Sequence, residues 1–190
     1  MANTDMQHAA LWLIGPDVPG LLRLGAEFVA ERGGNIDKDI ADKFGEKAVV
    51  FMSITAEPDD IARMDRDKGL LKKSSGCGVV FQPMMEPTIP DGYEQQLHGI
   101  DIITDDAPGV IAALTRLMQE YGVRIVGHIG ERCVMPGPKR EIKAGQKFVL
   151  MLPTEFDRGG FNFKLGELVK TSGGQIKSSL RPVPGLLWWW

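Results

Sequence analysis

A loop motif, Asp-x-Pro-Gly followed by an apolar residue, occurs twice in the chain and supplies its best candidates for binding chemistry. The two copies are Asp17-Val18-Pro19-Gly20-Leu21 and Asp106-Ala107-Pro108-Gly109-Val110. Proline suits the first position of a helix, aspartate can cap the helix start, and glycine lets another group approach the backbone. Free amide groups at a helix start favour a carboxylate or another anion. Each loop is therefore a candidate cradle for a small ligand, although capping and tight turning alone would also explain its sequence.

Histidine, cysteine, serine and acidic residues show no arrangement typical of a metal site or a catalytic centre. The histidines and cysteines lack the spacing of metal ligands; they are His8, His98, His128, Cys77 and Cys133. The sequence contains no nucleophile-elbow motif with a Ser–His–Asp order, no phosphate-binding loop and no helix with clustered carboxylates. We therefore predict no catalytic residues, no metal and no cofactor, and we favour a binding protein over an enzyme.

The segments on either side of the first loop predict a strand that enters it and a helix that leaves it. Residues 8–14 are apolar and alternate weakly, whereas apolar residues recur at helical spacing over residues 21–32. The second loop has the same surroundings, and Gly109 follows Gly20 by 89 positions. A repeat at a constant offset indicates two similar structural units.

Each unit is expected to contain a strand, a helix, two strands, a helix and a final strand. In the first unit, we expect strands over residues 8–14, 35–41, 48–55 and 77–82, and helices over 21–32 and from residue 58 onward. In the second unit, we expect strands over residues 97–103, 123–129, 147–152 and 175–180, and helices over 108–121 and around 161–169. Such βαββαβ units form an antiparallel sheet with helices on one face, which is an α+β, ferredoxin-like fold.

Proline and glycine positions set the expected domain boundaries. These are a first domain over 1–82, a Pro-rich linker over 83–96, a second domain over 97–183 and a Trp-rich tail over 184–190. The second domain has a longer hairpin, residues 130–147, because proline and glycine interrupt it. Aligning Phe148 with Phe51 across this hairpin gives an offset of 97 positions, eight more than that of the loops.

Composition and charge limit the classes of partner. The 190 residues carry a net charge of −3, which provides no overall attraction to nucleic acid. No apolar run has membrane-spanning length, and the first residues lack the pattern of a signal peptide. Two cysteines in different repeats make no disulfide framework. We therefore expect a cytoplasmic protein that contacts neither membrane nor nucleic acid directly.

The first loop and the residues that follow it resemble the opening of an ACT domain. In the first unit, Asp17-Val18-Pro19-Gly20-Leu21 and Gly33-Gly34-Asn35-Ile36 carry the resemblance, and the second unit repeats the loop. Two such units in one short chain, the second with a long hairpin, look like the glycine cleavage system transcriptional repressor group of tandem-ACT proteins. The resemblance covers residues 8–183 and implies two ACT domains that sense a small effector without chemistry of their own.

The resemblance also implies that the effector binds where the loop of one unit meets a strand of its neighbour. In the first unit this strand carries Asn35 and Ile36, and in the second it carries Arg124 and Ile125. Asn35 can both donate and accept hydrogen bonds. Arg124 would select a second carboxylate or a phosphate, unless the second unit has kept only a packing role. The first unit is therefore the preferred site at this stage.

By the same resemblance, the effector is an amino acid, with glycine as the first candidate, and the chain forms a homodimer that regulates a transcription regulator. Two alternatives stay open. The chain could regulate a folate or amino-acid enzyme in trans, or it could be a structural or interaction protein with vestigial loops. The tail with Trp188-Trp189-Trp190 is expected to pack on the protomer or in a dimer seam.

Overall fold

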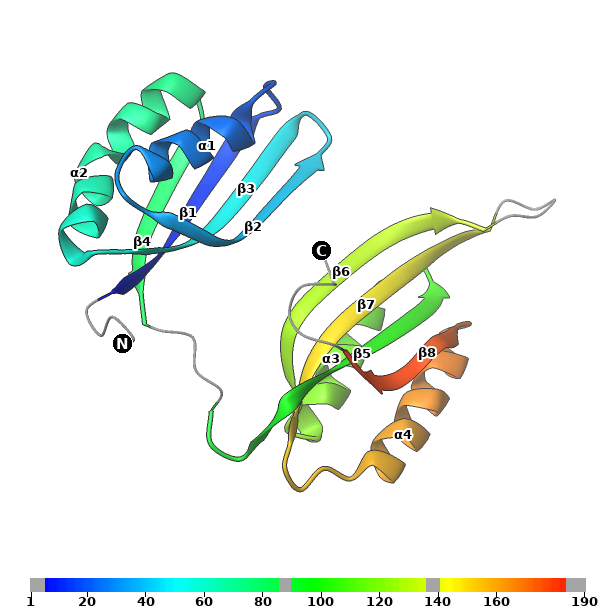
Figure 1. Cartoon of the computed structure of the whole chain (residues 1–190). Coiled ribbons are helices and arrows are strands. Elements are labelled where there is room, and N and C mark those ends of the chain that lie inside the picture. Colours follow the sequence, from blue (N-terminus) through cyan, green and yellow to red (C-terminus); the bar gives the residue numbers. More distant parts are fainter. Residues whose placement is uncertain (1–5, 86–89, 136–140, 184–190) are drawn as a thin grey trace. The chain divides into compact units, whose positions relative to one another are not determined.

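The structure is a computed structural model that describes residues 6–85, 90–135 and 141–183. It divides the chain into two compact units, Met1–Thr88 and Ile89–Trp190. In its described residues, each unit consists of one four-stranded sheet and two helices (Figure 1).

The first unit is an antiparallel sheet with the strand order β2-β3-β1-β4. Its elements in chain order are β1 (Gln7–Pro16), α1 (Leu21–Ala30), β2 (Asn35–Phe44), β3 (Lys47–Ala56), α2 (Pro58–Ser75) and β4 (Gly78–Met84). Both helices cover the same face of this sheet (Figure 1).

The second unit repeats this topology with the strand order β6-β7-β5-β8. Its elements are β5 (Tyr93–Asp105), α3 (Val110–Glu120), β6 (Arg124–Val134), β7 (Ile142–Pro153), α4 (Arg158–Thr171) and β8 (Gln175–Pro182). The predicted α+β fold of two ferredoxin-like βαββαβ units is therefore confirmed.

Alternating side chains of the central strands build a separate core in each unit. In the first unit, Leu11 and Leu13 of β1 are fully buried against the helices, and so is Met52 of β3. In the second unit, Ile100 of β5 and Phe148 of β7 occupy the equivalent layer. Because residues two apart share a face of the sheet, the intervening residues of these strands face away from the helices.

The segment between the two sheets is shorter than the expected linker over 83–96. β4 continues to Met84, and β5 begins at Tyr93. Pro83 can pair within β4 because β4 is an edge strand, where a missing amide hydrogen is tolerated.

The expected long hairpin over 130–147 is mostly paired strand. β6 and β7 pair as far as Val134 and Ile142, although their glycines indicated a loop. The basic pair Lys139 and Arg140 lies outside the described residues, and so does the tail over 184–190.

The strand registers also correct the alignment of the two units. Leu11 pairs with Met52, and its counterpart Ile100 pairs with Phe148. Phe148 therefore corresponds to Met52, and its alignment with Phe51 is wrong by one position. A slip of one residue matters because it moves a side chain to the other face of a sheet.

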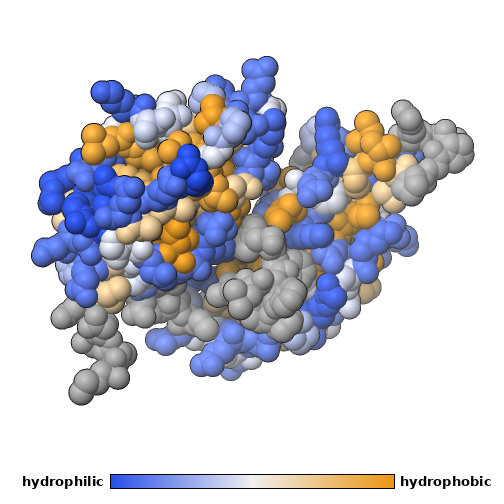
Figure 2. Space-filling model, turned by 45° about the horizontal axis from the view of Figure 1, so that its top comes forward, coloured by the Kyte–Doolittle hydropathy of each residue, from blue (hydrophilic) through white to orange (hydrophobic). Residues whose placement is uncertain are grey.

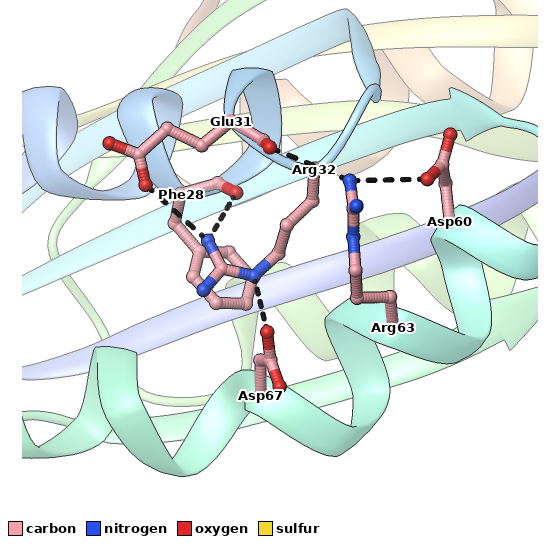
Figure 3. Close-up of polar contacts among 6 residues, drawn as sticks. All are labelled: Phe28, Glu31, Arg32, Asp60, Arg63 and Asp67. Carbon is pink, nitrogen blue, oxygen red and sulfur yellow. Dashed lines mark hydrogen bonds and ion pairs between the residues drawn. The ribbon is translucent and has the colours of Figure 1, made fainter.

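An arginine that follows α1 holds this helix against α2 (Figure 3). Nε of Arg32 lies 3.0 Å from Oδ2 of Asp67 on α2, and Nη1 donates to the carbonyl oxygen of Phe28 over 3.1 Å. The guanidinium also lies 4.0 Å from the centroid of the Phe28 ring. The Arg32 side chain is only 13% exposed, so its ion pair is better shielded than a surface pair.

We predict that Arg32→Ala lowers the free energy of unfolding of the first unit by about 1–3 kcal/mol, because Asp67 loses its partner and Phe28 loses its stacked cation. Urea unfolding followed by far-UV circular dichroism measures this loss. The matched control is Arg23→Ala, whose ion pair with Glu27 joins side chains that are 66% and 49% exposed. Equal losses in both variants would contradict the role assigned to Arg32.

Candidate ligand site beside the second loop

The first Asp-x-Pro-Gly loop enters α1 through a left-handed turn. Gly20 directly precedes the helix and has a φ of 85°, a value that favours glycine. The helix begins at Leu21, so the prediction that Pro19 occupies the first helical position is wrong. Capping by Asp17 is also absent, because its carboxylate lies 2.5 Å from Nζ of Lys43 on β2 instead.

The second loop repeats this geometry. Gly109 has a φ of 88°, and α3 begins at Val110. Oδ2 of Asp106 lies 2.6 Å from Nη2 of Arg132 on β6. Arg132 follows Lys43 by 89 positions, the offset that separates the loops. Each loop is thus tied by its aspartate to a cation on the neighbouring hairpin.

A pocket of about 400 Å³ lies beside the second loop, where β5 leads toward α3. Three of the predicted binding residues line it, namely Asp106, Ala107 and Val110. The remaining walls come from β5, β6, β7 and the start of α3.

Three polar side chains from neighbouring strands line the pocket on its sheet side: Thr104 of β5, His128 of β6 and Gln146 of β7. Nε2 of His128 lies 2.7 Å from Oε1 of Gln146 and donates to it when Nε2 carries the proton. The His128 ring stacks on Phe148 with a centroid distance of 4.4 Å, which fixes its plane. Thr104 is fully buried, and its Oγ1 has no hydrogen-bond partner among the described residues.

The first unit fills the place of Thr104 with a side chain from another segment. Thr104 corresponds to Gly15, where an added Cβ would lie 2.5 Å from Sγ of the buried Cys77. Cys77 corresponds in turn to Gly174, where an added Cβ would lie 3.0 Å from Cγ2 of Thr104. The first unit thus has a glycine on its first strand and a cysteine before its last strand, and the second unit has a threonine and a glycine at these places. As a result, the second unit buries a hydroxyl group where the first unit buries a thiol.

The other two polar residues of the pocket are also specific to the second unit. The strand registers place Gln146 where the first unit has the buried Val50, and His128 where it has Asp39. The shared fold of the two units therefore does not require polar residues at these positions.

Charged side chains surround the rim of the pocket. The lining includes the carboxylates of Asp105, Asp106 and Glu131, and one guanidinium, that of Arg132. Nζ of Lys143 donates to Asp105 over 2.5 Å, and this hydrogen bond raises the pKa of the Lys143 ammonium. Because the lining carries more carboxylates than cations, it favours a ligand that contains a positively charged group.

The strand residues assigned by the resemblance lie away from the loops. Asn35 and Ile36 begin β2, and Arg124 and Ile125 begin β6, at the end of each sheet that is remote from its own loop. The side-chain amide of Asn35 donates to Asp37 over 3.0 Å. A loop could therefore meet one of these strand ends only from another unit.

Thr104, Gln146 and Arg132 lie at the site but outside the motif from which the binding residues were predicted. A signal was present, because Gln146 replaces an apolar residue in a buried strand and Arg132 repeats Lys43 at the offset of the loops. In the sequence, His128 suggests only a metal ligand, and its spacing from the other histidines and cysteines does not support that role. In the described part of the chain, no group of three or more His, Cys, Asp or Glu side chains could hold a metal ion. None of the helices described there is long and apolar enough to span a membrane.

Comparison with known proteins supports the fold. No family model and no curated protein matches the sequence. The structure of an unknown protein from Galdieria sulphuraria is 13% identical, with 94% of this chain and 99% of that chain covered and a TM-score of 0.73. A proposed glycine cleavage system transcriptional repressor is 15% identical, with 95% and 99% covered and a TM-score of 0.67. The chain therefore has the fold of a tandem ACT-domain protein, as its loop motif indicated.

Proposed function

We propose that this protein is a non-catalytic regulatory module that binds an amino acid in the pocket of its second unit. The observation that carries the proposal is the buried hydroxyl of Thr104, which lines the pocket beside Gln146 without a partner among the described residues. A buried polar group in this state costs about 1–3 kcal/mol, so a ligand that completes its hydrogen bonding gains affinity. The fold, which is that of a proposed transcriptional repressor, supports a regulatory role.

The rim of the pocket suits the two charges of an amino acid. Arg132 and Asp106 form an ion pair at the pocket, and the Arg132 side chain is 77% exposed, so it can move. The α-carboxylate of a ligand can replace Asp106 at the guanidinium, while its ammonium group replaces Arg132 at the Asp106 carboxylate. The pocket volume of about 400 Å³ accommodates small amino acids, and glycine stays the first candidate.

This proposal moves the preferred site from the first unit to the second. The first unit has the same loop, but it places Gly15, Val50 and Asp39 where the second unit has its three polar pocket residues. The side chains that can form hydrogen bonds with a bound amino acid are therefore concentrated in the second unit.

We further propose that binding is relayed to a protein partner of a cytoplasmic homodimer. A ligand that separates Asp106 from Arg132 removes one of the ion pairs that connect the β6–β7 hairpin with the loop region, so hairpin states with and without this pair bind the ligand with different affinity. Such a difference is what an allosteric effector needs in order to shift a conformational equilibrium. The proposed partner is a transcription regulator, and the alternative is a metabolic enzyme. A pull-down with the ligand present distinguishes these alternatives by the class of protein that is captured.

We predict that at least one amino acid raises the melting temperature of the full chain, because a ligand that binds only the native state stabilises it. Differential scanning fluorimetry against all standard amino acids measures this shift, with folates and nucleotides as other chemical classes, and calorimetric titration gives the stoichiometry. If no amino acid binds at millimolar concentration, the proposed function is wrong.

We predict that Thr104→Val weakens binding of that amino acid about tenfold while it leaves the ligand-free protein equally stable or more stable. The reason is that valine keeps the shape of threonine but removes a hydroxyl that lacks a partner without ligand. The matched control is Asn35→Ala in the first unit, which should leave binding unchanged. If binding is lost in Asn35→Ala and kept in Thr104→Val, the ligand binds in the first unit and the proposed site is wrong.

A further inference from the structure

The face of the first sheet that its helices do not cover carries a continuous row of apolar side chains. Ile40 pairs with Phe51, Phe51 pairs with Trp12, and Trp12 pairs with Val80, so the row crosses all four strands. The rings of Trp12 and Phe51 are 5.4 Å apart between centroids. Val80, on the edge strand β4, is 51% exposed.

A second, shorter row extends this surface toward the first loop. Val49 of β3 pairs with Ile14 of β1, two positions along each strand from Phe51 and Trp12. Ile14 is 50% exposed. An antiparallel sheet with one solvated face normally places polar residues there, so an apolar surface of this size is typical of an interface. Figure 2 shows another view of the surface, in which hydrophobic residues lie among hydrophilic ones.

The second sheet shows that the repeat does not require this apolar surface. At the positions of Trp12 and Phe51 it carries Asp101 and Lys147, which pair with each other across β5 and β7. The edge-strand partner of Asp101 is Ser178. The apolar row through Trp12 and Phe51 is thus specific to the first unit, and its role is separate from that of the pocket in the second unit.

Two opposite charges flank the apolar row on the same face of β2. Lys38 lies two positions before Ile40, and Asp42 lies two positions after it. A twofold axis that runs along the row, between two copies of this sheet, reverses the strand direction of one copy. Lys38 then lies opposite the partner subunit's Asp42, and Asp42 lies opposite the partner subunit's Lys38, while the apolar row covers itself.

We propose that this face, formed by Trp12, Ile14, Ile40, Val49, Phe51 and Val80, docks onto the same face of a second copy of this chain. The apolar row covers itself and the charges that flank it are complementary, which an isologous interface requires. Four strands about 4.8 Å apart and five residues about 3.3 Å apart, from Lys38 to Asp42, give roughly 320 Å² of flat sheet per copy. Two such faces stay below the roughly 1,200–2,000 Å² of a standard specific interface, so we expect a weak dimer that dissociates at micromolar concentrations.

The test is the association of the full chain, measured by sedimentation equilibrium from about 1 to 100 μM, where specific dimers dissociate measurably. We expect a dimer that Val80→Lys weakens by about tenfold or more, because the lysine is placed in the apolar contact. Leu70→Lys is the matched control, since Leu70 is 60% exposed on α2, on the opposite side of the unit. Circular dichroism establishes that both variants are folded.

A charge exchange tests the predicted orientation of the two copies. Lys38→Glu and Asp42→Lys should each weaken the dimer, and the double variant should restore it, because only the twofold arrangement sets these positions against each other. A monomer over the whole concentration range would overturn the proposal. A dimer that Leu70→Lys dissociates and Val80→Lys does not would overturn it as well. This inference rests on the homodimer of the proposed function, whereas amino-acid binding at Thr104 does not depend on either outcome and is tested separately.

Discussion

The pairing register of the central strands is the constraint on which both units depend. Side chains alternate between the two faces of a strand, so the register of β1 with β3, and of β5 with β7, decides which residues the helices cover. In the first unit this register buries Leu11 and sends Trp12 to the other face. In the second it buries Ile100 and sends Asp101 outward. The same backbone arrangement therefore supports a core on one face and two very different surfaces on the other.

The two units have divided their features rather than duplicated them. The loops keep the same left-handed glycine and the same tie from an aspartate to a hairpin cation. The polar pocket belongs to the second unit, where Thr104, His128 and Gln146 replace residues that the first unit uses for packing or leaves at the surface. The apolar row through Trp12 and Phe51 belongs to the first unit. The proposed ligand pocket and the proposed dimer face therefore lie in different halves of one chain.

The sequence predicted the fold well, because strong local signals agreed with the repeat. Apolar alternation, the two Pro-Gly loops and the glycines after the helices predicted the strands and helices that the structure describes. Errors arose where local composition was misleading. Gly130 and Gly145 indicated a loop but lie in paired strands, and Pro83 indicated a linker but lies in an edge strand, where its missing amide is tolerated.

The candidate site was only partly predictable. The motif located Asp106, Ala107 and Val110, which line the pocket. It did not include Thr104 or Gln146, because these residues lie outside the motif and only the strand register shows that their side chains face the helices. The ion pair of Asp106 with Arg132 joins residues far apart in the sequence, and no local pattern encodes such a contact.

The exchange between Gly15 with Cys77 and Thr104 with Gly174 restricts how one unit could have diverged from the other. A chain that carried the larger residue at both places would clash, since the added atoms would lie within about 3 Å of each other or of the backbone. Neither pair can therefore change into the other by one substitution, because the larger residue can enter one place only after glycine stands at the other. A form that is small at both places leaves room at this end of the sheet, next to the position that lines the pocket in the second unit.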